Sequence, residues 1–449
     1  MQRTLSQRTL SAFLAIIASL LLQAQPPNVP WTALGGGTDK KVQALLRLSN
    51  GDLLVAGQFT IAGGAAHSRV ARWDGATYTA LPGFPEQFEI SSAAELNGIV
   101  YVGGKPTFQS PYKDLMKWDG SAWTGEDVFR GKNPLSGIQA LFVHDGMLYA
   151  SGDITGIVGT DYDVLRLNGA SWELVGGPMN HYIRCIGYFD GHLVCAGEFT
   201  SRYLSTANEI QHVTYLDGNT WVQLGDGLDG TVYDLLVEGN TLYATGDMLT
   251  PTDAYFGLAR ITPDATTWEQ LMPNIRDYVR TPVSGMMSGQ SMVAHNGELY
   301  IGGEFLIGGA TVGRGVAVFH GAPDEVEAYC DFGGPVQALA LINDHELVIG
   351  GTSSRYQHIA STDLLANGIT DPAARASFTV SPNPTTGLLL VEHATASTAH
   401  VLDMAGRVVL AIPLHKGTNT VDVRTLTDGC YLLRMADGDA VRMARFVKQ

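Results

Sequence analysis

A turn dipeptide between two apolar runs occurs seven times along this chain, and this recurrence constrains the fold more than any other feature. The turns lie 45 to 58 residues apart, at Asn50-Gly51, Asn97-Gly98, Asp145-Gly146, Asp190-Gly191, Gly239-Asn240, Asn296-Gly297 and Asn343-Asp344. A period of this length is typical of repeat architectures, in which each copy is one supersecondary unit of a larger body. We therefore expect an assembly of seven similar units.

Each repeat contains four short β-type segments. In the first copy, residues 42–48 (VQALLRL) and 52–59 (DLLVAGQF) flank the Asn-Gly turn, which is the strongest local signal for a tight hairpin. Residues 69–75 and 76–81 supply the third and fourth segments. A four-stranded sheet with apolar residues on both faces is buried when successive copies pack face to face and close into a ring. The sequence predicts an all-β fold, a seven-bladed β-propeller.

The final repeat lacks its fourth strand. Residues 336–363 supply three segments of the seventh unit, and no Trp-containing strand follows them. One unassigned segment of that type, Trp31 to Leu34, lies near the start of the chain. We therefore expect this N-terminal segment to complete the seventh blade and to close the ring.

The repeat resembles the kelch-type propeller repeat. The carrying features are a Gly-Gly, Ala-Gly or similar small pair that ends the second strand, an apolar third strand, and a Trp-x-x-Leu fourth strand such as Trp221 to Leu224. The resemblance implies a binding scaffold, which is only occasionally an enzyme. Since one fold hosts many functions, the fold alone assigns none.

The N-terminus has the pattern of a secretory signal peptide. Arg3 and Arg8 precede an apolar stretch, Leu10 to Leu22, which is too short for a comfortable membrane span, and the small residue Ala24 follows. We expect four parts: a signal peptide (1–24), the propeller (25–364), a linker (365–377) and a C-terminal β-sandwich (378–449). No later segment is apolar enough to span a membrane, so we expect no transmembrane segment in the mature chain.

The C-terminal part resembles the type A C-terminal sorting domain of the type IX secretion system of Bacteroidetes. Its turns and alternating apolar residues indicate a small antiparallel β-sandwich. The residues that carry the resemblance are Pro382, Asn383, Pro384, Gly387, Asp403, Gly406, Gly429 and Tyr431. The resemblance implies recognition by the type IX secretion machinery, passage through the periplasm, and release or attachment at the cell surface.

Charge and cysteine content narrow the function. With 28 Lys and Arg against 44 Asp and Glu, the net charge of −16 repels phosphate backbones, so we expect no nucleic-acid partner. We also expect the protein to be a monomer. Cys185 and Cys195 flank the Asp190-Gly191 turn. A three-residue loop would place them opposite each other and a two-residue loop would not, so a disulfide and simple packing both stay open. Cys330 and Cys430 fall in different regions and are expected not to pair.

The sequence contains no recognisable catalytic or metal motif. It has no H-E-x-x-H, no zinc spacing, no G-x-S-x-G elbow, no P-loop and no calcium-loop spacing. We therefore expect no metal, no cofactor and no enzymatic activity.

Candidate ligand-binding residues lie in the long loops that connect second to third strands and successive blades. These loops collect aromatic rings, carboxylates and guanidinium groups, which suit a glycan or a peptide. The candidates are Tyr112, Asp161, Tyr162, Asp163, Tyr203, Tyr278 and Arg280. The leading hypothesis is a secreted or cell-surface binding protein. The alternatives are a carbohydrate- or peptide-active hydrolase or lyase that uses Asp161 and Asp163 as its carboxylate pair, and a purely structural surface protein.

Overall fold

The computed structural model divides the chain into two compact units, Met1–Asp363 and Leu364–Gln449. It describes residues 31–106, 113–128, 137–153, 162–202, 205, 210–249, 255–271, 289–307, 311–321, 326–364, 380–381, 385–393, 397–402, 408–427, 429–437 and 440–448. Several of the predicted long loops lie outside these residues.

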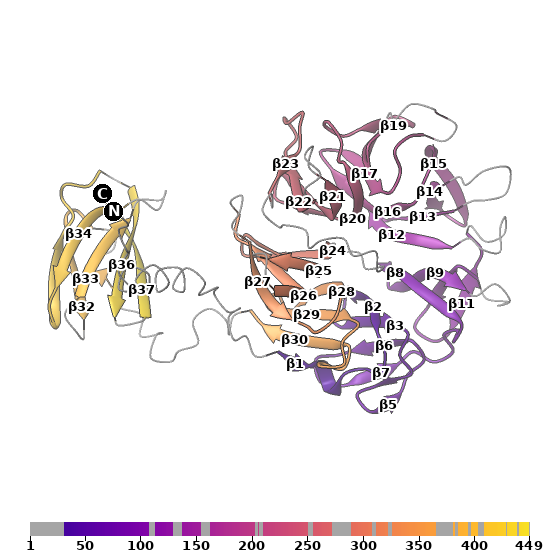
Figure 1. Cartoon of the computed structure of the whole chain (residues 1–449). Helices are drawn as coiled ribbons and strands as arrows, with labels where there is room; N and C mark the ends of the chain where they lie inside the picture. The colour runs from indigo at the N-terminus through magenta and orange to yellow at the C-terminus, as the bar shows by residue number, and fades with distance from the viewer. Residues whose placement is uncertain are drawn as a thin grey trace, which may run out of the picture. The chain divides into compact units, whose positions relative to one another are not determined.

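Unit 1 is a β-propeller of seven four-stranded antiparallel sheets arranged around one axis (Figure 1). We number the blades in chain order. Their strands are β2 (Val42–Arg47), β3 (Leu53–Gly57), β6 (Val70–Trp73) and β7 (Tyr78–Ala80) in blade 1; β8 (Phe88–Leu96), β9 (Ile99–Pro106), β10 (Leu115–Trp118) and β11 (Trp123–Glu126) in blade 2; β12 (Ile138–His144), β13 (Met147–Asp153), β14 (Tyr162–Asn168) and β15 (Ser171–Met179) in blade 3; β16 (Ile183–Phe189), β17 (His192–Gly197), β18 (Val213–Asp217) and β19 (Thr220–Gln223) in blade 4; β20 (Gly230–Glu238), β21 (Thr241–Leu249), β22 (Tyr255–Ile261) and β23 (Glu269–Gln270) in blade 5; β24 (Gly289–His295), β25 (Glu298–Ile307), β26 (Thr311–Phe319) and β27 (Val326–Asp331) in blade 6; and β28 (Val336–Ile342), β29 (Glu346–Gly351) and β30 (Ile359–Asp363) in blade 7.

The N-terminal segment closes the ring, as predicted. Strand β1 (Thr32–Ala33) pairs antiparallel with β30, with Thr32 opposite Ser361 and Ala33 opposite Ala360. The first strands of the blades contact one another around the whole circle, and β28 of blade 7 returns to β2 of blade 1. The predicted fold class is confirmed.

In five of the seven turn dipeptides both residues have positive φ, whereas Asn50-Gly51 and Gly239-Asn240 have it at the glycine alone. Asn97 and Gly98 have φ values of 53° and 77°, and the pair Asp190 and Gly191 has 48° and 80°. Positive φ at both central residues defines the type I′ turn, whose twist matches that of the strands it joins and which favours Asn-Gly and Asp-Gly. Each of the seven recurring dipeptides lies in the hairpin that joins the first and second strands of a blade.

At three junctions the aromatic residue near the start of the fourth strand donates a hydrogen bond to the blade before it. The indole of Trp123 donates to the carbonyl of Leu81 at 3.1 Å, and that of Trp268 to the carbonyl of Leu224 at 3.0 Å. At the closure, the hydroxyl of Tyr78 in blade 1 donates to the carbonyl of Leu34, which follows β1, at 2.9 Å. At these three junctions the Leu that ends the aromatic-x-x-Leu pattern accepts, through its carbonyl, a hydrogen bond from the aromatic residue of the next blade.

Every first strand contains a β-bulge at the same place. The residue skipped in the register with the second strand is Gln43, Ser91, Gln139, Arg184, Tyr233, Gln290 or Gln337 in blades 1 to 7. The glycine that ends the second strand packs against this strand. A Cβ at Gly104, Gly197, Gly246 or Gly351 would lie 2.1 Å from a backbone carbonyl oxygen. This close approach explains why the second strands end in small residues.

Cys185 and Cys195 are free thiols on opposite faces of blade 4. The loop between them has two residues, so Cys195 lies opposite Ile186 and Cys185 opposite Ala196. Cys185 packs toward blade 5 and Cys195 toward blade 3. Burial raises the pKa of both thiols well above the ordinary value, so they fill space in the core. Cys330 is also buried and free.

Unit 2 is the predicted antiparallel β-sandwich. One sheet has the order β31 (Val380–Ser381), β32 (Leu388–His393), β35 (Gly417–Asp422), and the other has β34 (Val408–Leu414), β33 (Ser397–Leu402), β36 (Gly429–Asp437), β37 (Ala440–Lys448). Alternate residues such as Leu389 and Val391 of β32 and Val401 of β33 form its buried core with Tyr431 and Leu433. This unit therefore has a hydrophobic core of its own.

Candidate functional site

Most of the predicted loop residues fall outside the part of the chain that the structure describes. This holds for Tyr112, Asp161, Tyr203, Tyr278 and Arg280, and in the sorting motif for Pro382, Asn383, Pro384, Asp403 and Gly406. Their assignment stays a prediction. Within the described residues of unit 2, Gly387 packs on Arg424, whose Cγ would lie 2.2 Å from an added Cβ, and the Tyr431 hydroxyl donates to the carbonyl of Thr427 at 2.9 Å. Gly429 begins β36.

Two of the predicted loop residues lie in a strand. Tyr162 and Asp163 are the first residues of β14, not part of the preceding loop, and Asp163 is buried. The matching residue of blade 2, Asp114, is also buried and accepts a hydrogen bond from the Val128 amide at 2.7 Å. The comparison favours a structural role for the Asp163 carboxylate, because a buried strand residue does not present its side chain to a ligand in solvent.

Polar residues instead recur in the first two strands of the blades, at the end to which the long loops belong. Each blade contributes two positions there: the bulged residue of its first strand and the residue that follows the glycine at the end of its second strand. The second set is Gln58, Lys105, Asp153, Glu198, Asp247, Glu304 and Thr352. We define the axial cluster as Gln139, Arg184, Glu198 and Tyr233 from these positions of blades 3 to 5, together with His181 and Tyr182, which directly precede β16.

Arg184 is the centre of the axial cluster. Its Nε donates to Oε1 of Glu198 at 2.7 Å, its Nη2 donates to the same oxygen, and its Nη1 donates to Oε1 of Gln139 in blade 3 at 3.1 Å. The Cζ atom lies 4.9 Å from the ring centroid of Tyr182. These contacts fix the guanidinium in one orientation, while 32% of the Arg184 side chain stays exposed to solvent.

The rings of His181 and Tyr233 lie close to the Arg184–Glu198 ion pair. Nδ1 of His181 lies 2.9 Å from Oε2 of Glu198, so that both carboxylate oxygens are engaged. Tyr233, the bulged residue of blade 5, has a raised pKa because of burial and, secondarily, the nearby Asp247 carboxylate. The cluster thus combines oriented donors and acceptors with two phenol rings, and its charges largely compensate one another.

The axial cluster was not predicted from the sequence, because the candidate residues were placed in the long loops and the cluster lies mainly on the first two strands of the blades. A signal was nevertheless present in the repeat. The residue after each small pair of the second strand is polar in all seven copies, and it is charged in five of them, as at Glu198 and Asp247. A polar position that recurs next to apolar strands indicates a shared surface, and here that surface is the mouth of the ring.

The described residues contain no group of three or more His, Cys, Asp or Glu side chains arranged to hold a metal ion. Among the same residues, Asp234 is the carboxyl group whose pKa is raised, to about 7, because of its burial between blades 5 and 6. Both of its oxygens accept backbone hydrogen bonds, from Leu235 at 2.9 Å and from Met292 at 2.7 Å. This geometry is structural, so we assign Asp234 no acid–base role.

The C-terminal unit is similar to a known family. Residues 379–449 match the family described as "Secretion system C-terminal sorting domain". The molecule is thus a β-propeller protein with a C-terminal sorting domain, and it is exported by type IX secretion to the cell surface or the extracellular space. The predicted export route and localisation are confirmed. No helix within the described ranges combines the length and the apolar character that a bilayer span needs.

Two solved structures are similar to this chain at low sequence identity. The extracellular domain of the two-component system BT4673 from B. thetaiotaomicron is 10% identical, with a TM-score of 0.50; the match covers 95% of this chain and 60% of that one. PorZ, a surface component of the type IX secretion system of Porphyromonas gingivalis, is 14% identical over 92% of this chain and 59% of its own, with a TM-score of 0.46. This chain therefore spans about 60% of the length of these structures. None of the curated protein sequences matches it.

Proposed function

We propose that this protein is an exported binding protein whose propeller recognises an extracellular glycan or peptide at the axial cluster. The observation that supports it is the Arg184 guanidinium, which is held by Glu198 and Gln139, lies against Tyr182 and remains a third exposed. A fixed guanidinium–carboxylate pair offers donors and acceptors in set directions, and the adjacent rings supply stacking surface. Hydroxyl-rich glycans and peptide backbones both present complementary groups.

Replacing Arg184 tests this proposal. We expect the full chain to bind a subset of glycans or peptides on an array, and Arg184→Ala to weaken that binding at least tenfold, because an ordered, charge-assisted contact stabilises a complex by about 1.5–3 kcal/mol. Arg166→Ala is the matched control, because Arg166 forms a comparable ion pair with Glu173, at 3.1 Å, in the outer part of blade 3. Array binding that Arg184→Ala and Arg166→Ala leave equally unchanged would contradict the proposal, as would the absence of any bound ligand.

A further inference from the structure

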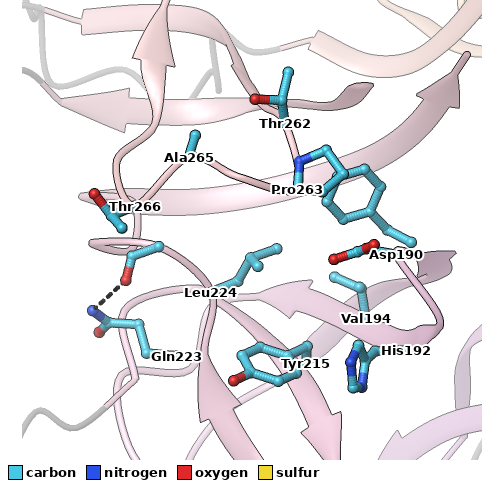
Figure 2. A pocket seen from close by; sticks show the side chains of 12 residues that line it. Asp190, His192, Val194, Tyr215, Gln223, Leu224, Thr262, Pro263, Ala265 and Thr266 are labelled. Atoms are coloured by element: carbon cyan, nitrogen blue, oxygen red, sulfur yellow. Dashed lines mark hydrogen bonds between the residues drawn. The ribbon is translucent and has the colours of Figure 1, made fainter. Parts of the chain in front are cut away.

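A pocket of about 360 Å³ lies between blades 4 and 5. Val194, Tyr215 and Leu224 of blade 4 form one side, and the loop between the third and fourth strands of blade 5, from Thr262 to Thr266, forms the other (Figure 2). The hairpin turn of blade 4 at Asp190 borders it as well. The pocket shares no residue with the axial cluster. We call it the inter-blade pocket.

Blade 4 departs from the repeat at this pocket. The second residue before the turn that ends the third strand is basic in blades 1 to 3, and the register of β22 places Arg260 of blade 5 at the same position. Arg72, Lys117, Arg166 and Arg260 each form an ion pair with a nearby carboxylate, those of Asp52, Glu126, Glu173 and Glu269. Blades 6 and 7 have the uncharged Val318 and Ser361 at this position. Blade 4 has Tyr215, which lies between Val194 and Val222. An ion pair is thus replaced by an aromatic face that lines the pocket.

His192 fixes the orientation of this aromatic face. Its Nδ1 lies 3.0 Å from the carbonyl oxygen of Leu216, and its ring meets the Tyr215 ring edge to face with centroids 5.1 Å apart. Both rings line the pocket. Contacts of this kind restrict the side-chain rotamers before any ligand arrives, which lowers the entropy lost on binding.

Blade 5 departs from the repeat on the other side of the pocket. Residues 261–268 separate Arg260 from its cross-strand partner Glu269, whereas only residues 73–78 separate the equivalent Arg72 from Thr79 in blade 1. Blade 6 has a loop of the same length as blade 5, between Val318 and Glu327. The longer loop brings Pro263 and two threonine hydroxyls over the face of blade 4 (Figure 2). At this pocket an aromatic residue of one blade therefore faces a longer loop of the next blade.

The lining indicates the chemistry of a ligand. Tyr215, Phe189, Leu224 and Pro263 are apolar or aromatic, while Asp190, Gln223 and the threonines supply hydrogen-bonding groups. A pyranose ring matches this mixture, because its C–H face packs on aromatic rings and its hydroxyls bond to carboxylate and amide groups. The lining has a carboxylate but no Lys or Arg, and the chain carries a net charge of −16, so an anionic ligand is disfavoured.

We propose that the inter-blade pocket binds one neutral pyranose residue, which packs on Tyr215 and bonds to Asp190 and Gln223. The cavity volume is close to the lower end of the range of roughly 300–1,000 Å³ for ligand pockets, which suits a single ring. The site goes beyond the function proposed above, because it needs neither the axial cluster nor its ligand.

The test is titration of the full chain with methyl glycosides of glucose, galactose and mannose, followed by saturation-transfer NMR, with glucuronate as the anionic probe. We expect at least one neutral glycoside to bind in the millimolar range and glucuronate to bind at least tenfold more weakly. Tyr215→Ala should reduce the neutral binding at least tenfold, and Tyr215→Phe, which keeps the ring, should change it less than threefold. Arg166→Ala, at the same strand position of blade 3, should leave it unchanged.

Two further variants test the proposal independently of Tyr215. Ala265→Leu adds volume on the blade 5 side and should reduce binding at least tenfold even if Tyr215→Ala fails to fold. Arg184→Ala should leave glycoside binding unchanged, so failure of the axial proposal and failure of this one are distinguishable. The inference is overturned if no neutral glycoside binds, if glucuronate binds as tightly as the best neutral glycoside, or if folded Tyr215→Ala and Ala265→Leu bind as the parent does.

Discussion

The residue that directly follows the bulge of the first strand can accept, through its side chain, a hydrogen bond from a backbone amide of the next blade. Ser92 Oγ accepts a hydrogen bond from the Leu141 amide at 3.0 Å, and Ser291 Oγ accepts one from the Leu339 amide at 3.1 Å. Asp234 Oδ2 takes the same place for Met292. Blades 1, 3, 4 and 7 have Ala or Cys at this position, because it faces the tight space between inner strands. Asp234 is thus the single charged member of the series.

The charge of Asp234 makes the propeller pH-sensitive. Its pKa in the folded state is about 7, against the ordinary value of 3.8, because burial disfavours the carboxylate. Between these values the folded chain holds a proton that the unfolded chain releases, so stability falls as the pH rises from 4 to 7 and stays lower above 7. Asp234→Asn removes this dependence and keeps an acceptor for Met292. We expect Asp234→Asn to be more stable than the parent by ~1–4 kcal/mol at pH 8 and nearly equal at pH 4.

Urea unfolding followed by tryptophan fluorescence measures this difference for the propeller alone, because all seven Trp residues precede residue 364. Asp344→Asn is the control. Asp344 is an exposed carboxylate whose pKa is lowered by its hydrogen bond to Arg47, so its replacement should give a small change of the opposite sign at pH 8. Equal pH profiles for the parent and Asp234→Asn would refute the assignment.

At the scale of elements, the ring depends on a two-residue strand far from its partner in sequence. Strand β1 adds few backbone hydrogen bonds, but Leu34 behind it is buried with Trp73 and Tyr78 of blade 1 and with Val348 and Ile359 of blade 7. The segment therefore contacts both blades at the closure. It also covers the outer edge of β30, which would otherwise present unpaired backbone groups.

Deleting residues 31–37 should open the ring at this point. We expect the free energy of unfolding of the propeller to fall by about 3–5 kcal/mol, since a buried Leu and a strand are lost together. Thermal unfolding measures the loss, and size-exclusion chromatography should show association through the exposed β30 edge. Tyr78→Phe removes only the hydrogen bond to Leu34, so it should cost about 1 kcal/mol and leave the chain monodisperse. A deletion no worse than Tyr78→Phe would show that β1 does not close the ring.

At the scale of the molecule, the architecture could be predicted because each part of it depends on local chemistry. Asn-Gly and Asp-Gly turns mark the hairpins, the count of Trp-containing strands identifies the closing segment, and alternating apolar residues mark the C-terminal sandwich. The axial cluster was not predicted, because it forms where Arg184, Glu198 and Gln139 meet across two blades through bulges that no local pattern specifies. The buried state of Asp163 was missed for the same reason: its surroundings come from packing between strands.

We expect export to require a folded C-terminal unit. The matched sorting domain has about seventy residues, and a domain of that size is stabilised by only about 5 kcal/mol. Tyr431 is buried in its core, and a buried aromatic replaced by Ala costs about 3–5 kcal/mol. Tyr431→Ala should therefore leave the C-terminal unit with only about 0–2 kcal/mol of stability, so that up to about half of the chains have an unfolded tail. We expect it to lower the surface or extracellular fraction measurably, but less than deletion of residues 379–449 does. Tyr431→Phe keeps the ring and loses the hydroxyl that bonds to Thr427, so it should be exported normally, as should Arg184→Ala in the other unit. Immunoblots of medium, surface and cell fractions compare the four chains, and normal export of Tyr431→Ala would show that recognition of the tail does not require this core.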